Sequence, residues 1–153
     1  RSSNDLKKKI YGILLIMAVT AIFLLTLQSP QGTVRLSEGV RLWLWQLGIE
    51  MTFHGIRSNA HLPLYFVFGL ILSLYGRESG WRWRMILIAG AAVGLADEVL
   101  KIFLPTREFD LIDLIKDWIG VGTAACVIWL IQKVKARHQA EKGKRHEEIS
   151  KNT

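Results

Sequence analysis

Six charged side chains interrupt two apolar stretches in the second half of this sequence. They are Asp97, Glu98, Lys101, Asp113, Lys116 and Asp117. Charge inside an apolar segment is costly, so such residues usually face one another, a wet cavity or a ligand. We expect His61 and Tyr65 to meet them, because two residues four apart share one face of a helix. Carboxylates beside a histidine can carry out acid–base chemistry or hold a polar ligand.

One interpretation is a binding site for the polar headgroup of a membrane lipid or of another lipid-tailed ligand. Arg57 and Arg107 would take its phosphate or carboxylate, and neighbouring apolar helix faces would receive its tail. The predicted ligand-binding residues are Arg57, His61, Tyr65, Glu98, Lys101, Arg107, Asp113 and Asp117. The predicted partner is therefore a membrane lipid or a lipid-tailed ligand.

The alternative is a membrane enzyme that acts on a lipid-linked envelope substrate. Its candidate catalytic residues are His61, Glu98, Arg107 and Asp113. His61 or Glu98 would act as general acid or base. Asp113 or Asp117 would orient that group, and Arg107 would stabilise developing negative charge. We favour binding, because the sequence has no activated Ser or Cys nucleophile motif and no phosphate-cradling glycine loop.

Three further interpretations stay open. The charges could form a structural ion-pair network that holds helices in register. A proton-coupled transporter could use buried carboxylates and a histidine, although four helices offer little pathway unless the protein forms a homo-oligomer. An oxygen-ligated divalent cation among the carboxylates is the third. Because Cys126 is the lone cysteine and histidines are few, we predict no metal and no cofactor.

Four apolar segments must position these residues. Ile10 to Leu27 is free of charge over eighteen positions, about 27 Å of helix, which is enough to span a bilayer. The other predicted spans are 61–75, 85–104 and 111–132. The sequence therefore predicts an all-α integral membrane bundle of four transmembrane helices. A tryptophan-rich stretch from Ser37 to His54 predicts a possible interfacial helix between the first and second spans.

The basic residues predict the orientation. Of 20 Lys and Arg, fourteen lie in the N-terminus, in the 76–84 loop and in the tail, and six lie elsewhere. This bias predicts a multipass cell-membrane protein with both termini in the cytoplasm. The predicted parts are a basic N-terminus (1–9), a transmembrane domain (10–132) and a basic tail (133–153) that is either a frayed helix or disordered. Because these charges flank apolar runs, we expect no nucleic-acid partner.

Spacing also predicts how the helices meet. Gly90 and Gly94, and Gly120 and Ala124, are small residues four apart that would let the third and fourth spans approach closely. We expect the turn at 105–110 to bring Arg107 back over both helices, where it would pair with the acidic residues.

Two motifs carry a family resemblance. Residues 57–65 read Arg-Ser-Asn-Ala-His-Leu-Pro-Leu-Tyr, and residues 97–107 read Asp-Glu-Val-Leu-Lys-Ile-Phe-Leu-Pro-Thr-Arg, followed by Asp113, Asp117 and Gly120. Over about residues 10 to 131 the chain resembles the VanZ-like family of small bacterial membrane proteins. That family's motifs are Arg-Lys-x-Ala-His-x-x-x-Tyr and Asp-Glu-x-x-Gln-x-Phe-x-Pro-Gly-Arg, with Asp-x-x-x-Asp/Asn-x-x-Gly after them.

The resemblance implies a multipass membrane protein that contributes to tolerance of teicoplanin, a lipid-tailed glycopeptide acting at the outer face of the membrane. The chain departs from the pattern at Ser58, Lys101 and Thr106, where the family has Lys, Gln and Gly. We hypothesise that Lys101 replaces the cation missing at Ser58. A local pair between Lys101 and Glu98, three residues apart, is the alternative.

Overall fold

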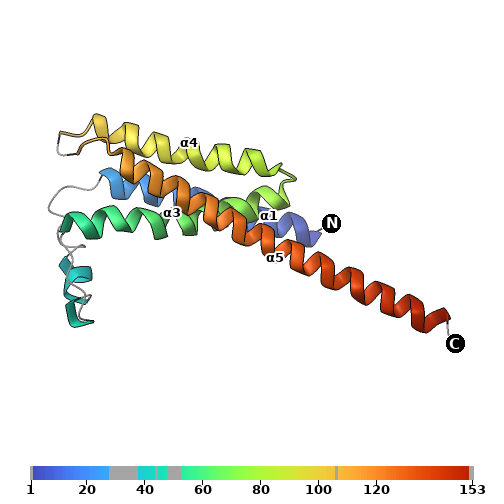
Figure 1. Ribbon diagram of the computed structural model, residues 1–153. Coiled ribbons are helices and arrows are strands. Elements are labelled where there is room, and N and C mark those ends of the chain that lie inside the picture. The colour runs from blue at the N-terminus through green and yellow to red at the C-terminus, as the bar shows by residue number, and fades with distance from the viewer. Residues whose placement is uncertain (1, 28–37, 44, 48–52, 106, 152–153) are drawn as a thin grey trace.

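Four long helices make up the bundle. The computed structural model describes residues 2–27, 38–43, 45–47, 53–105 and 107–151, with the side chains of residues 2, 53–58 and 144–151 left aside. The helices are α1 (Ser2–Leu27), α3 (Phe53–Glu78), α4 (Trp83–Ile102) and α5 (Leu111–Lys151). Figure 1 shows them side by side in an elongated bundle. No strand occurs in the described ranges, so the predicted all-α fold is confirmed.

Three of these helices contain segments long and apolar enough to cross a membrane, whereas the sequence predicted four. The segments are Ser3–Leu27, Asn59–Glu78 and Leu111–Gly143. α4 is not among them, because charged residues occur near both of its ends. The outer surface of α1 is apolar, with Ile13, Ile16 and Met17 at least 60% exposed. Such a surface is typical of a helix that faces lipid.

The helix boundaries differ from those expected at two places. α3 begins at Phe53, eight residues before the predicted start, and Pro63 lies inside it. Proline is tolerated within a membrane helix when neighbouring groups satisfy the freed carbonyl. α5 continues through the predicted tail to Lys151, because that segment is rich in Lys, Glu, Ala and Arg, which favour helix. Figure 1 shows this part of α5 projecting beyond the bundle.

The turn between α3 and α4 has a clear local cause. Gly80 adopts a φ of 71°, a left-handed conformation that glycine reaches without steric cost. The Gly80 N–H donates to the Arg77 carbonyl at 3.0 Å, and the Trp81 N–H donates to the Gly76 carbonyl at 2.8 Å. These two bonds form a Schellman motif, which ends α3 and turns the chain back.

The turn between α4 and α5 ends in a helix cap. The Asp110 carboxylate accepts a hydrogen bond from the Ile112 N–H at 2.8 Å, as an N-cap residue does. The N–H of the same Asp110 donates to Glu98 Oε2 of α4 at 3.1 Å. Asp110 therefore joins the end of α4 to the start of α5.

Small residues bring the helices close, partly in the predicted way. A methyl group added to Gly90 of α4 would lie 2.4 Å from the Val121 side chain of α5, so these helices do approach closely. A methyl group added to Gly120 would lie 2.8 Å from the Leu62 carbonyl oxygen of α3. Gly120 therefore faces α3, and the expectation that it faces α4 is wrong. Helical periodicity identifies a face but not its partner.

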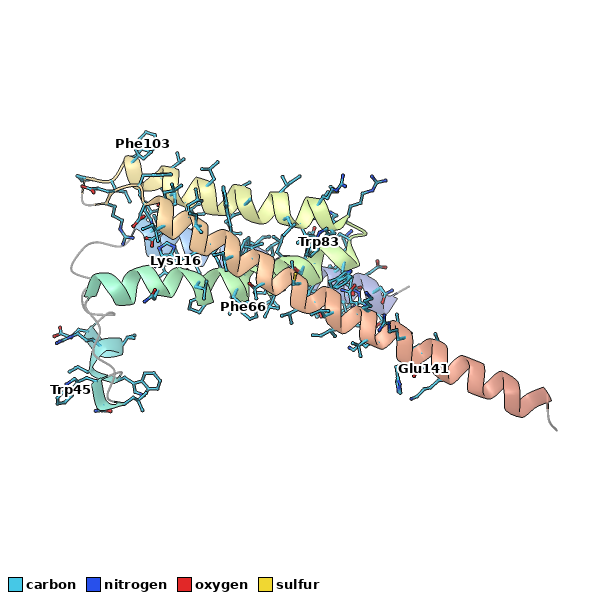
Figure 2. The ribbon with its side chains drawn as sticks, viewed as in Figure 1. Trp45, Phe66, Trp83, Phe103, Lys116 and Glu141 are labelled. Carbon is cyan, nitrogen blue, oxygen red and sulfur yellow. The ribbon has the colours of Figure 1, made fainter. Side chains whose placement is uncertain are left out.

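The predicted interfacial segment is described only in part. Residues 38–43 are helical, and residues 48–52 lie outside the described residues. Trp43 and Trp45 are more than 60% exposed, and Figure 2 shows Trp45 well away from the four-helix bundle. The placement of this segment in the membrane interface stays a prediction.

Candidate functional site

Charged and polar side chains gather at one end of the bundle. This end contains the last turn of α1, the first turns of α3 and α5 and the last turns of α4, and it lies opposite the N-terminus (Figure 1). We call these side chains the polar cluster: His61, Tyr65, Asp97, Glu98, Lys101, Asp113 and Asp117. Figure 2 shows Lys116 at the same end, while Glu141 lies on the projecting part of α5.

The polar cluster is almost fully enclosed. Glu98, Lys101 and Asp117 are 0% exposed, Asp97 is 1% exposed and Asp113 is 4% exposed. The His61 side chain is 12% exposed and is more accessible than the side chains of Asp113, Asp117, Glu98 and Lys101. Buried charge of this density needs partners, because removing an ion from water costs several kcal/mol.

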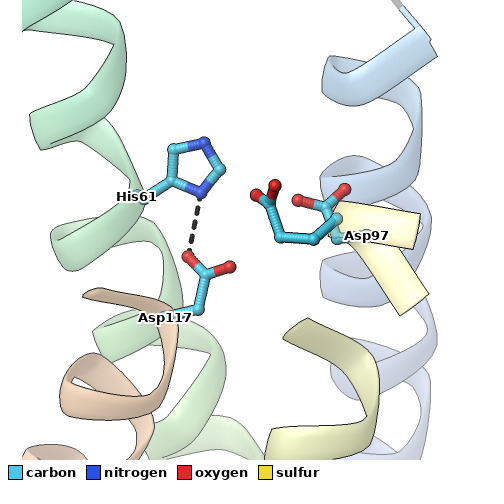
Figure 3. A group of neighbouring side chains, drawn as sticks. His61, Asp97 and Asp117 are labelled. Atoms are coloured by element: carbon cyan, nitrogen blue, oxygen red, sulfur yellow. Dashed lines mark hydrogen bonds and ion pairs between the residues drawn. The ribbon is translucent and has the colours of Figure 1, made fainter. Parts of the chain in front are cut away.

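His61 is held by carboxylates of α5. Its Nδ1 lies 2.8 Å from Asp117 Oδ1 (Figure 3), and its Nε2 lies 3.5 Å from Asp113 Oδ2. The imidazole is stacked on the Tyr65 ring, with 6.2 Å between centroids and 7° between planes. A proton on Nδ1 would satisfy the bond to Asp117 and leave Nε2 as an acceptor. Lys101 Nζ, 3.5 Å from Nε2, can donate to it.

Lys101 is the central cation of the polar cluster. Its ammonium donates to Glu98, three residues earlier on α4, and lies 3.6 Å from Asp113 Oδ2 of α5. The predicted local pair of Lys101 with Glu98 is thus confirmed. Because the same ammonium also reaches α5 and His61, it joins three helices rather than stabilising α4 alone.

α1 contributes two contacts that the sequence did not reveal. The Thr26 hydroxyl donates to Asp97 Oδ1, and Thr26 is 4% exposed. Arg107 Nη2 donates to the Leu25 carbonyl at 3.1 Å. The signal for Thr26 was a hydroxyl at the end of the long uncharged run from Ile10 to Leu27. Nothing in the sequence could say which carboxylate it would meet.

A partly open rim borders the polar cluster. Lys116 Nζ lies 4.0 Å from Asp113 Oδ1 and donates to Asn59 Oδ1 at 3.3 Å. Its side chain is 23% exposed. Lys116 therefore provides a cation at the rim, while the interior beneath it carries more carboxylates than ammonium groups.

Most of the predicted site residues lie together in this structure. His61, Tyr65, Glu98, Lys101, Asp113 and Asp117 all belong to the polar cluster. The Arg57 side chain lies outside the described residues. Arg107 lies in the turn between α4 and α5 and contacts α1. Its pairing with Glu98 and Asp113 stays a prediction.

The geometry permits two kinds of chemistry. An imidazole with one nitrogen held by a carboxylate is oriented for proton transfer through its other nitrogen. A group of buried carboxylates with few cations can also hold a positively charged ligand. Both need a ligand that reaches the interior past the rim.

An apolar outer surface and a buried polar cluster are typical of helical membrane proteins. The comparison with protein families matches residues 10–132 to the VanZ/LLP1 family, and the chain belongs to this family. The comparisons with curated proteins and with solved structures found no match. The resemblance expected from the two motifs is therefore confirmed, and the protein is a VanZ-like membrane protein.

Proposed function

We propose that this protein binds a lipid-tailed ligand of the cell envelope at the polar end of its bundle, and thereby raises tolerance to teicoplanin-like glycopeptides. The observation that carries the proposal is the polar cluster itself. Four carboxylates and an ammonium from α4 and α5 are buried together, with His61 at the accessible edge. Buried ion pairs add little net stability, so their concentration at one end favours a role in binding.

The rim and the helix surfaces suit the two parts of such a ligand. Lys116 and Arg107 offer cationic donors for a phosphate or carboxylate at the rim. The apolar side chains around the same end are strongly exposed, with Phe103 at 77% and Ile112 at 62%, and Figure 2 shows Phe103 pointing away from the bundle. A headgroup on the rim would leave an acyl tail against these surfaces.

The topology behind this proposal has four spans with both termini in the cytoplasm. The 20 residues of α4 give a helix of about 30 Å, which is long enough to cross the hydrocarbon core. Its charged residues Asp97, Glu98 and Lys101 are buried among other helices, so they need not contact lipid. The excess of Lys and Arg at the opposite end favours an orientation with the polar cluster at the outer face.

Cysteine labelling tests the topology. Cys126 is exposed and is first changed to Ala, after which single cysteines are introduced as Ser37→Cys and Glu141→Cys. Membrane-impermeant reagent added to intact cells should label the first and spare the second. Labelling of Ser37→Cys from the cytoplasm alone would place the polar cluster on the wrong side.

Native mass spectrometry tests the binding. Wild-type protein and His138→Ala, which removes an exposed histidine of the α5 extension, should both retain a lipid-sized adduct after gentle purification. His61→Ala should lose it. Wild-type protein without an adduct would contradict the proposal. If His61→Ala retains as much of the adduct as wild type does, the polar cluster is not the binding site and serves as a structural ion-pair network.

An enzyme of lipid-linked substrates is the second candidate, because the contact of His61 with Asp117 orients the imidazole. His61 or Glu98 would transfer the proton in such a reaction. Envelope lipids extracted from cells that express wild-type protein would then be chemically altered. Lipids from cells that express His61→Ala would not. Unaltered lipids in both strains would rule out this alternative.

A further inference from the structure

Four side chains with metal-ligand atoms converge inside the polar cluster, from three different helices. They are His61 of α3, Asp97 and Glu98 of α4, and Asp117 of α5. One ligand atom from each lies within 4.8 Å of the others, and Figure 3 shows the carboxylates and the imidazole around a common space. We propose that these four residues hold a divalent transition-metal cation between the helices.

An unpartnered atom points into this space. Asp117 is 0% exposed, and its Oδ2 has no hydrogen-bond partner among the described residues. Figure 3 shows its Oδ1 engaged by His61 and its other oxygen directed toward Asp97. A buried carboxylate oxygen without a partner is unfavourable, because it has lost its contact with water and gained no hydrogen bond in return. A cation between the carboxylates would satisfy it.

The charge of the interior also favours a cation. Four carboxylates (Asp97, Glu98, Asp113 and Asp117) are buried with one ammonium, Lys101. With His61 neutral and the carboxylates ionised, the formal charge is −3, which a low-dielectric interior cannot hold without compensation. A divalent cation reduces it to −1, and Lys116 at the rim lies 4.0 Å from Asp113 to offset the rest.

Outer-shell hydrogen bonds hold the proposed ligands. Thr26 donates to Asp97, and the Asp110 N–H donates to Glu98 at 3.1 Å. The His61 ring is oriented by stacking on Tyr65 and by its contact with Asp117, which is itself a proposed ligand. Ligating residues in metal sites are typically oriented by such partners. Each ligand-bearing side chain is therefore positioned before any ion arrives.

The ligand set indicates the class of ion. One imidazole nitrogen with carboxylate oxygens suits Mn²⁺, Fe²⁺ or Zn²⁺, whereas Ca²⁺ and Mg²⁺ prefer oxygen ligands alone. Cys126 is exposed on the outside of α5 and not part of the group. The ion would be held whether or not a lipid-tailed ligand binds, because its ligands lie beneath the rim.

Mn²⁺ titration of chelator-treated protein in detergent, without added lipid or antibiotic, tests the site. Free Mn²⁺ is followed by its electron paramagnetic resonance signal. Wild-type protein should bind one Mn²⁺ per chain, and Zn²⁺ should displace it. Asp117→Asn should weaken binding by at least about tenfold. The matched variant Asp5→Asn, which changes an exposed carboxylate of α1, should bind like wild type.

A second measurement on wild-type protein alone covers the case in which Asp117→Asn fails to fold. Electron spin-echo modulation from ¹⁴N should reveal an imidazole nitrogen bonded to the Mn²⁺, as His61 predicts. The proposal is overturned by the absence of saturable binding in wild-type protein. Equal binding in Asp117→Asn, or bound Mn²⁺ without nitrogen modulation, would overturn it as well.

Discussion

Adding one methyl group at Gly120 should disturb the helix contact that positions His61 against α5. A Cβ on Gly120 would lie 2.8 Å from the Leu62 carbonyl oxygen and 2.9 Å from the Phe66 nitrogen, both backbone atoms of α3. Backbone atoms cannot swing aside as a side chain tip can. In Gly120→Ala, α3 and α5 must therefore separate by several tenths of an ångström next to the polar cluster.

Gly122 supplies a matched control on the same helix, because a Cβ there meets nothing within 4 Å. Both Gly→Ala changes gain about the same helix propensity, up to ~1 kcal/mol. The difference in unfolding free energy between the two variants thus isolates the clash. Overpacking typically costs about 1–3 kcal/mol, so we expect Gly120→Ala to be less stable than Gly122→Ala by that amount.

The assay is denaturant unfolding of both variants in the same detergent micelles, followed by circular dichroism. The free energy of unfolding of Gly122→Ala should equal or exceed that of wild type. If Gly120→Ala is as stable as Gly122→Ala, α5 does not approach α3 as closely at Gly120 as the structure indicates.

Three further predictions concern the contacts of the polar end. Lys101→Gln should lower the free energy of unfolding by about 3–5 kcal/mol, because Glu98 and Asp113 lose a buried partner. If a lysine at position 58 can supply the same cation, the double variant Ser58→Lys with Lys101→Gln should regain that stability. A double variant no more stable than Lys101→Gln would contradict the relocation of the cation and leave the local pairing of Lys101 with Glu98 as the explanation. Thr26→Val should cost about 1–3 kcal/mol in the same assay, since the buried Asp97 loses a donor, and a neutral result would refute that contact. Arg107→Ala should cost about 3–5 kcal/mol, as expected if Arg107 pairs with the buried carboxylates in addition to its bond to the Leu25 carbonyl; wild-type stability of this variant would contradict that pairing.

The fold class could be predicted because long apolar runs leave few alternatives to helices. The convergence of His61 with the acidic residues of two later segments was predictable for a related reason, since charge inside an apolar helix must find a partner. The span at 85–104 was predicted on the same hydropathy, yet α4, which covers it, carries too much charge to be a clear span by composition. Its assignment depends on burial, which a sequence does not display.

Partners across helices could not be predicted in the same way. Thr26 and Asp97 are 71 residues apart, and only the packing of α1 on α4 brings them together. Gly120 shows the same limit, because its spacing indicated a close contact and left the partner helix undetermined. The end of α5 could be predicted only as two alternatives. The low apolar content of residues 133–153 indicates either a frayed helix or a disordered tail, and the structure has a helix as far as Lys151.

The most direct test of the proposed function is the teicoplanin tolerance of cells that express the protein at equal membrane abundance. Wild-type protein and His138→Ala should raise the minimum inhibitory concentration above that of cells without the protein. His61→Ala, which removes the accessible edge of the polar cluster, should not raise it. If His61→Ala protects cells as well as wild type does, the polar cluster is not the functional site.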